Sequence, residues 1–299
     1  MRRRTFITTV TAGTLIAGCV GDVSNPSDPD PEPPDDVEYY VGDIVPGDGL
    51  NFKLNNAERT TDVDTHHDLD RGEEFLLVDV TAKNVSEERY TPIPNLLSST
   101  VKDIDGDVYD SISGPDTIIS SELLPGELDS GIIPFIVPND AGGLYLRLDR
   151  DYALPAELDD YRVAVEIESD DPGELTQDIP SEYIHAVGDI AEYNGYEITV
   201  EEANATTELD MYTETEDGKE FITVTFSTEG DGGSSESRAR HLTDHRGYNY
   251  TRDIDATDAA RDAHNTDQVF QVPEGTSPVY WVYKAGSRGI EGKQVFEVH

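Results

Sequence analysis

Two stretches of this chain, 146 residues apart, share one sequence pattern. Val41-Gly42-Asp43-Ile44 recurs as Val187-Gly188-Asp189-Ile190. The same offset carries further pairs: Leu54 onto Val200, Ala57 onto Ala203, Gly72 onto Gly218, Glu74 onto Glu220 and Phe75 onto Phe221. Farther along, residues 135–138 match residues 270–273 at an offset of 135, so the second copy has lost about eleven residues. One register over so long a stretch indicates a duplicated domain.

Apolar and polar residues alternate within each copy, which is the period of a β-strand. In EFLLVDVTAKN every second residue from Leu76 to Ala82 is apolar, and EFITVTFS repeats the pattern in the second copy. Further strands are expected at 130–137, 143–149, 161–168, 268–272, 279–284 and 294–298, and one short helix at 257–263. Asp48-Gly49, Asn194-Gly195 and Asp105-Gly106 are typical hairpin turn pairs. We therefore predict an all-β fold with two tandem immunoglobulin-like antiparallel β-sandwiches.

The first copy is similar to a telokin-like, immunoglobulin-like domain of unknown function that is common in exported lipoproteins. The matching pieces span most of residues 40–150: VGD, GLNFKLNNAE, GEEFLLVDVTAKNVSEE, DIDGDVYDS, LLPGELDSGIIPFIVPND and LYLRLD. The second copy keeps the opening and VFQVPEG but lacks a clear LxPGE segment, so its match is weaker. The resemblance implies a sandwich at the cell surface, related in fold to a mycobacterial immunoprotective antigen, and it implies no reaction.

The N-terminus is typical of an export signal. Arg3, Arg4 and Phe6 form a twin-arginine pattern, and residues 7–17 are an apolar run too short to span a bilayer, which needs about 20 residues. Ile16-Ala17-Gly18-Cys19 resembles a lipobox, which implies that Cys19, the only cysteine, becomes the new N-terminus and carries a lipid. A plain signal peptide with an idle cysteine is the alternative.

Residues 20–36 contain five prolines among acidic residues and cannot bury enough apolar surface to fold. We expect a disordered, extended tether there. The predicted organisation is therefore a signal at 1–18, the lipidated cysteine and tether at 19–38, and sandwiches at 39–169 and 184–299, with a linker at 170–183 between them.

The charge is strongly negative, with 21 Lys and Arg against 63 Asp and Glu and a formal net charge of −42. Nucleic-acid binding is excluded, because phosphate contacts need a basic surface. The acids are spread along the chain and not gathered into a tail, which favours a salt-adapted, halophilic surface whose self-repulsion is screened in molar salt.

One loop is the best candidate for a metal site. In DVDTHHDLD the residues that could bind a cation, if the stretch is extended, are Asp62, Asp64, His66, His67, Asp68 and Asp70. Carboxylates suit Ca²⁺ or Mg²⁺, and the histidine pair suits Zn²⁺ or Cu²⁺. A solvated acidic loop is the alternative, and no cofactor is assigned.

Two further motifs, in equivalent places of the two copies, are expected to be structural. DIDGDVYD, residues 103–110, resembles a calcium loop but is expected to be a hairpin with Asp105-Gly106 at its turn, and HLTDHRGYNY occupies the equivalent place in the second copy. Trp281 is expected in the core, with Tyr280 and Val282 facing outward as a contact surface.

Asn84, Asn204 and Asn249 begin glycosylation sequons.

The sequence contains none of the common catalytic signatures, such as G-x-S-x-G, H-E-x-x-H or a phosphate loop. We therefore expect no enzyme but a surface protein, anchored to the membrane through Cys19, that binds a protein or envelope partner. Metal or solute capture by residues 62–70 is the alternative function. An envelope hydrolase with paired carboxylates is a third.

Overall fold

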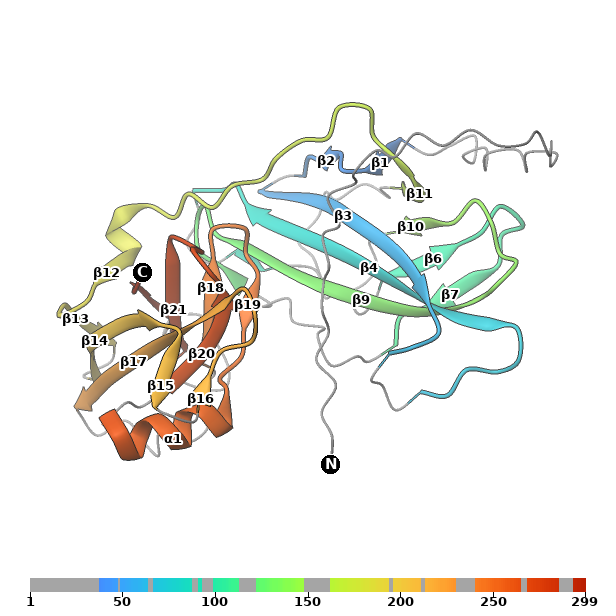
Figure 1. The fold of residues 1–299 in the computed structure, drawn as a ribbon. Helices are drawn as coiled ribbons and strands as arrows, with labels where there is room; N and C mark the ends of the chain where they lie inside the picture. Colours follow the sequence, from blue (N-terminus) through green and yellow to red (C-terminus); the bar gives the residue numbers. More distant parts are fainter. Residues whose placement is uncertain are drawn as a thin grey trace, which may run out of the picture. The chain divides into compact units, whose positions relative to one another are not determined.

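The computed structural model describes residues 38–47, 49–63, 67–87, 91–92, 99–112, 122–147, 162–193, 196–210, 213–229, 240–264, 268–284 and 293–299. Strands make up most of this part of the chain, and Pro33–His299 form one unit (Figure 1). The prediction of an all-β fold with two sandwiches is confirmed. Within the described ranges no helix has both the length and the apolar character needed to cross a membrane.

The first sandwich consists of a five-stranded and a four-stranded sheet. The first has the order β1 (Tyr39–Val41), β11 (Arg162–Glu168), β10 (Tyr145–Arg147), β6 (Thr100–Lys102) and β7 (Val108–Asp110). The second has the order β2 (Ile44–Val45), β3 (Leu50–Thr60), β4 (Glu73–Asn84) and β9 (Leu128–Pro138). A short pair, β5 (Thr91–Pro92) with β8 (Glu122–Leu123), adds a ribbon.

The second sandwich has the same strand order. Its five-stranded sheet runs β12 (Ile184–Ala186), β22 (Lys293–Glu297), β21 (Val279–Lys284), β18 (Arg240–Asp244) and β19 (Asn249–Tyr250). Its four-stranded sheet runs β13 (Ile190–Tyr193), β14 (Tyr196–Thr206), β17 (Lys219–Glu229) and β20 (Gln268–Pro273). Each strand therefore has a counterpart in the first sandwich, in the same position of the same sheet.

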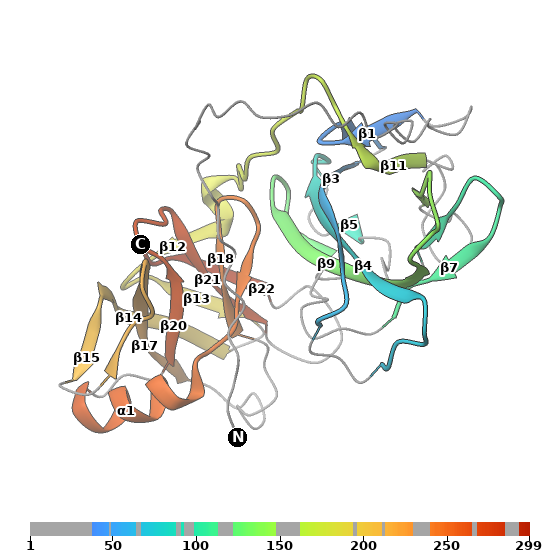
Figure 2. The same cartoon turned by 45° about the vertical axis from the view of Figure 1, so that its right-hand side comes forward.

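Both five-stranded sheets contain one parallel pair, which the antiparallel pattern did not predict. β1 runs parallel to β11, and β12 runs parallel to β22; Figure 2 shows β1 alongside β11. In each sandwich the first strand lies beside the last, at the edge of the sheet. The remaining pairs are antiparallel, as predicted.

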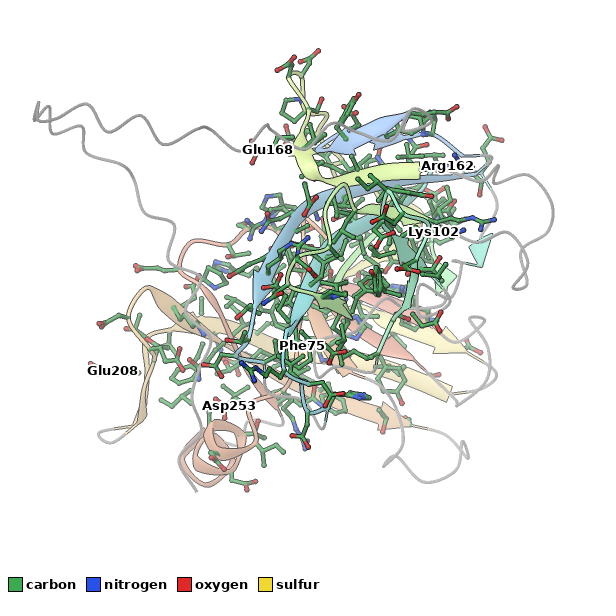
Figure 3. All side chains as sticks on the ribbon, turned by 90° about the vertical axis from the view of Figure 1, so that its right-hand side faces the viewer. Phe75, Lys102, Arg162, Glu168, Glu208 and Asp253 are labelled. Atoms are coloured by element: carbon green, nitrogen blue, oxygen red, sulfur yellow. The ribbon has the colours of Figure 1, made fainter. Side chains whose placement is uncertain are left out.

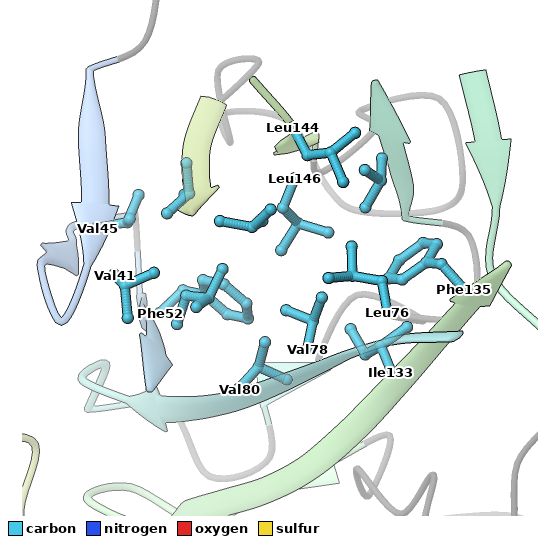
Figure 4. Packing of buried hydrophobic residues seen from close by; sticks show 14 of the residues in the cluster. Val41, Val45, Phe52, Leu76, Val78, Val80, Ile133, Phe135, Leu144 and Leu146 are labelled. Carbon is cyan, nitrogen blue, oxygen red and sulfur yellow. The ribbon is translucent and has the colours of Figure 1, made fainter. Parts of the chain in front are cut away.

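The core of the first sandwich follows the predicted alternation (Figure 4). Leu50, Phe52 and Leu54 of β3 are buried, while the residues between them are half-buried. Phe135 from β9 and Leu146 from β10 close the core from the two sheets. Each such side chain contributes about 1.5–3 kcal/mol through the apolar surface it removes from water.

The second core is centred on Trp281. Its side chain is fully buried, packs against Tyr283 and Phe296, and donates from Nε1 to Gln268 Oε1 at 3.0 Å. The prediction that Trp281 belongs to the core is confirmed.

The second sandwich also carries additions outside its two sheets. Helix α1 (Ile254–His264) contains the predicted helical stretch and packs Ala256 and Ala260 against Phe221 and Val269. The short ribbon β15 (Glu208–Asp210) with β16 (Thr213–Glu214) lies beside it. A 3-10 turn, η2 (Ser181–Tyr183), precedes β12.

Candidate interaction site

The hairpin between β6 and β7 is held by one carboxylate. Asp103 Oδ1 accepts hydrogen bonds from the backbone N–H of Asp105 and Asp107 at 3.0 and 2.9 Å, and its Oδ2 accepts from the Tyr109 hydroxyl at 2.7 Å. Gly106 turns the chain with φ of +91°, a conformation that disfavours other residues. DIDGDVYD is therefore a hairpin, as predicted.

The hairpin between β18 and β19 repeats this arrangement 141 residues later. Asp244, fully buried, accepts from the backbone N–H of Arg246 and Tyr248 at 2.9 and 3.1 Å and from the Tyr250 hydroxyl at 3.0 Å. Gly247 takes the turn position with φ of +82°. Both hairpins share the pattern D-x-x-G-x-x-Y, at residues 103–109 and 244–250. We did not predict it from the sequence, although the spacing of Asp, Gly and Tyr is visible there.

Each hairpin tyrosine donates its hydroxyl to the aspartate of its own turn. Burial, with the neighbouring Asp103 carboxylate, raises the pKa of Tyr109 to about 12. Burial and Asp244 raise the pKa of Tyr250 as well. Both phenols therefore stay protonated at neutral pH, and the carboxylates that hold them serve the turns.

The second hairpin differs from the first because its tip contacts the first sandwich. Ser130 of β9 donates its backbone N–H to Gly247 O and its hydroxyl to Arg246 O, each at 2.9 Å. A Cβ placed on Gly247 would lie 2.8 Å from Leu128 Cβ, so this contact needs glycine. The tip of the first hairpin, in contrast, exposes Ile104 and Val108.

Side chains extend the contact along the outer face of the first sandwich. The Tyr248 hydroxyl donates to Asp79 Oδ2 at 2.9 Å, and Asn249 Nδ2 donates to Asp129 Oδ1 at 2.5 Å. Burial raises the pKa of Asp79, although hydrogen bonds from Asn55 and Tyr248 oppose that shift. Burial and Asp79 likewise raise the pKa of Tyr248, which keeps it a donor.

A buried ion pair also joins the two sandwiches, and we call this whole set of contacts between them the junction. Lys293 Nζ of β22 contacts Glu127 Oε1, and the two side chains are only 2% and 3% exposed. The other oxygen of Glu127 accepts the backbone N–H of Leu124 at 2.7 Å. Glu127 belongs to the Leu124–Glu127 segment (LPGE), which has no clear equivalent in the second sandwich, so this segment of the first sandwich binds the second.

Apolar side chains complete the junction. Tyr280, Val282 and Val295 form a buried cluster with Leu124 and Ile179, the last from residues 170–183. The predicted contact surface at Tyr280 and Val282 is therefore real, and other parts of the same chain cover it.

The linker is also bound to both sandwiches. Gln177 Oε1 accepts from Leu128 N at 3.0 Å, and Gln177 N donates to His245 O at 3.2 Å. Lys83 and Asp178 form an ion pair at 2.8 Å. A hollow of about 400 Å³ lies here, lined by Lys83, Asn84, Val85, Ser86, Glu87, Pro125, Gly126, Asp178, Pro180, Glu182 and Tyr183.

The proposed metal loop lies between β3 and β4. Asp62, His67, Asp68 and Asp70 are exposed there, while Asp64 and His66 lie outside the described residues. In the described part of the chain no three His, Cys, Asp or Glu side chains group closely enough to hold a metal ion. His241, Asp244 and His245, which lie close together in HLTDHRGYNY, form no such group either, and Asp244 accepts the hydrogen bonds of its turn.

The three sequon asparagines have different surroundings. Asn84 is fully buried and donates Nδ2 to Leu123 O at 3.1 Å, which argues against a sugar there. Asn249 is half-buried and bound to Asp129. Asn204 is exposed on β14.

The predicted signal and lipid residues, Arg3, Arg4, Phe6 and Cys19, lie outside the described residues, as does the tether.

Comparison with known proteins finds one family model that matches part of the chain. A family model for a domain of unknown function (DUF4352) matches residues 39–156. This match supports the coarser expectation, a domain of unknown function over most of residues 40–150. Among curated proteins, none matches the chain.

Solved structures with similar folds are distant in sequence. They include the secreted protein MPT63 from Mycobacterium tuberculosis, 17% identical with a TM-score of 0.34, covering 43% of this chain and 95% of that one. The yjhA protein of Bacillus subtilis is 15% identical with a TM-score of 0.35, covering 42% and 99%. An uncharacterized β-sandwich protein from Clostridium difficile is 17% identical with a TM-score of 0.31, covering 46% and 99%. This chain is therefore similar to secreted and uncharacterized β-sandwich proteins, and residues 39–156 match the DUF4352 domain.

Proposed function

We propose that the protein is a lipid-anchored, non-catalytic protein of the cell surface, whose two immunoglobulin-like sandwiches act together as one interaction module. The sandwiches would be copies of one domain, and the partner would be a protein or another component of the envelope. The module would serve envelope organisation, adhesion or presentation of a ligand.

The observation that carries this proposal is that the buried polar groups serve turns or the contact between the sandwiches. Asp103, Asp244, Glu127 and Lys293 are all committed to turns or to contacts between the sandwiches. A rigid pair of sandwiches suits a binding role, because recognition by loops or sheet edges needs a fixed scaffold.

The duplication is supported by equivalent details in the two copies. The strand order, the D-x-x-G-x-x-Y hairpins and the isolated bridges Ser111↔Phe135 and Arg252↔Phe270 correspond. The offset falls from 146 to 141 and then to 135, so the residues missing from the second copy fall in two places.

The location is argued from the sequence. A twin-arginine signal, the lipobox residue Cys19 and a proline-rich tether support export followed by anchoring on the outer face of the cytoplasmic membrane. A net charge of −42 supports a halophilic environment, where molar salt screens the self-repulsion.

Membrane fractionation tests the anchor. Replacing Cys19 by Ser removes the only sulfur that could carry the lipid, so the variant should move from the membrane fraction to the medium. Ser24→Ala, five residues downstream, is the control and should stay with the membrane. Retention of the Cys19→Ser variant at the membrane would refute the anchor.

A further inference from the structure

Each sandwich begins with the same tight corner, built from the repeated Val-Gly-Asp-Ile residues. In the first, Gly42 N donates to Leu54 O at 2.8 Å, and Asp43 Oδ2 accepts from Tyr40 N at 2.8 Å. In the second, Gly188 N donates to Val200 O at 2.8 Å, and the equivalent Asp189 Oδ2 accepts from Ala186 N at 2.8 Å. The two corners therefore offer the same backbone surface.

The first corner is covered by the chain that leaves the first sandwich. After Glu168, labelled in Figure 3 at the end of β11, residues 169–173 cross the corner. Ser169 N donates to Val41 O at 2.8 Å and Gly173 N donates to Gly42 O at 2.9 Å.

Side chains and small residues complete this cover. A Cβ on Gly42 would lie 2.9 Å from Pro172 Cβ, and a Cβ on Gly173 would lie 2.6 Å from the Ile44 side chain. Under this cover Val41 is only 9% exposed.

The second corner has no such cover among the described residues. Val187 is 41% exposed and Ile190 is 61% exposed. The last residues turn elsewhere, because Val298 N donates to Val279 O and Val279 N donates to His299 O. Two apolar side chains and a backbone surface that binds an extended peptide in the first copy thus face solvent in the second.

The tether preceding the first sandwich matches the covering segment in the repeat register. At the offset of 146, residues 23–27 align with residues 169–173, and Pro26 falls on Pro172. Pro34 likewise falls on Pro180. The two positions that donate backbone N–H groups in the linker correspond to Val23 and Ser27, which are not proline and keep their donors.

We propose that residues 23–27 of one molecule cover the Val187–Ile190 corner of a second molecule, in the way that residues 169–173 cover the first corner. The linker leads from the covered sandwich into the next one, and the tether leads into the first sandwich of its own molecule. The contact is therefore head to tail, and such contacts extend into rings or open chains.

The fit requires one adjustment. Ser27 stands where the linker has Gly173, and its Cβ would approach the Ile190 side chain. Ile190 is exposed and can change rotamer, whereas Ile44 is half-buried beneath the linker. Both surfaces are acidic, so we expect the contact to strengthen as salt rises, because screening removes their repulsion.

Sedimentation equilibrium of the mature chain with Cys19→Ser, in molar salt, tests this proposal without the lipid. The expected result is a concentration-dependent oligomer that weakens when salt is lowered within the range where the fold persists. Ile190→Asp should weaken association at least roughly tenfold, since it places a charge against apolar groups. Ser27→Pro, which removes one backbone donor, should weaken it on the order of fivefold.

Two matched variants serve as controls. Ile104→Asp changes an equally exposed isoleucine, 62% exposed, on the first hairpin. Ser24→Pro changes the tether at a position whose counterpart, Asp170, does not donate to the first corner. Both should leave association unchanged.

A synthetic peptide of residues 20–36 should compete for the Val187–Ile190 corner and so reduce association. A monomer at every concentration, or equal association in all four variants, would overturn the proposal.

Discussion

Replacing Lys293 by Met tests the junction between the sandwiches most sharply. The substitution keeps most of the apolar stem and removes the ammonium that faces Glu127, a side chain only 3% exposed. Breaking one partner of a buried ion pair costs about 3–5 kcal/mol, because the remaining charge is left unpaired. We expect a loss of that size in the free energy of unfolding, a large share of the roughly 5–15 kcal/mol typical of proteins.

The double variant separates this charge effect from packing. Lys293→Met combined with Glu127→Gln removes both charges of the pair, and the new amide oxygen can still accept from Leu124 N. We expect it to recover most of the loss, giving a coupling energy of roughly 2 kcal/mol or more. Lys219→Met is the control, because its pair with Glu216 at 3.0 Å is 34% and 43% exposed and should contribute less than about 1 kcal/mol.

Urea unfolding in molar salt measures these differences. The fluorescence of Trp281, the only tryptophan, reports the second sandwich, and circular dichroism reports both. A loss below about 1 kcal/mol for Lys293→Met, with no coupling to Glu127, would refute the reasoning from burial.

Three further predictions concern the hairpin tip, an acidic group and salt. Gly247→Ala should destabilise the protein more than Gly106→Ala, because both glycines have positive φ but only a Cβ on Gly247 would meet Leu128; equal losses in urea unfolding would show that the contact with Leu128 contributes nothing. Folding raises the pKa of Asp79, so the folded protein favours the protonated form of this side chain. Asp79 therefore contributes stability below its unfolded pKa of about 3.9. This contribution is lost as pH rises through the pKa of Asp79 in the folded protein. The stability of Asp79→Asn relative to the unmodified protein should therefore increase across that window, and a pH-independent difference would contradict the prediction. Dialysis from molar to low salt should loosen or unfold the sandwiches, as circular dichroism would record, and full stability at low salt would argue against the halophilic interpretation.

The alternation of residues was enough to predict the strands. Leu50, Phe52 and Leu54 point into the core as the pattern indicated, and Trp281 lies where its spacing from Pro273 placed it. These features are local, because a strand's two faces are visible in its own sequence.

The junction could not be predicted because its contacts join residues far apart in the chain. Glu127 and Lys293 are 166 positions apart, and neither differs locally from the many other charged residues. The LPGE segment carries part of the resemblance to a domain of unknown function, yet nothing in its sequence indicates Lys293 as its partner. Asn84 illustrates the same limit, since its sequon carries no sign that the side chain is buried.

Differential scanning calorimetry of residues 20–299 in molar salt tests most directly whether the two sandwiches behave as one unit. The contacts at Glu127, Asp79 and Gly247 predict a single transition whose calorimetric and van 't Hoff enthalpies agree. Two separate transitions, with the Trp281 fluorescence change confined to one of them, would contradict the account.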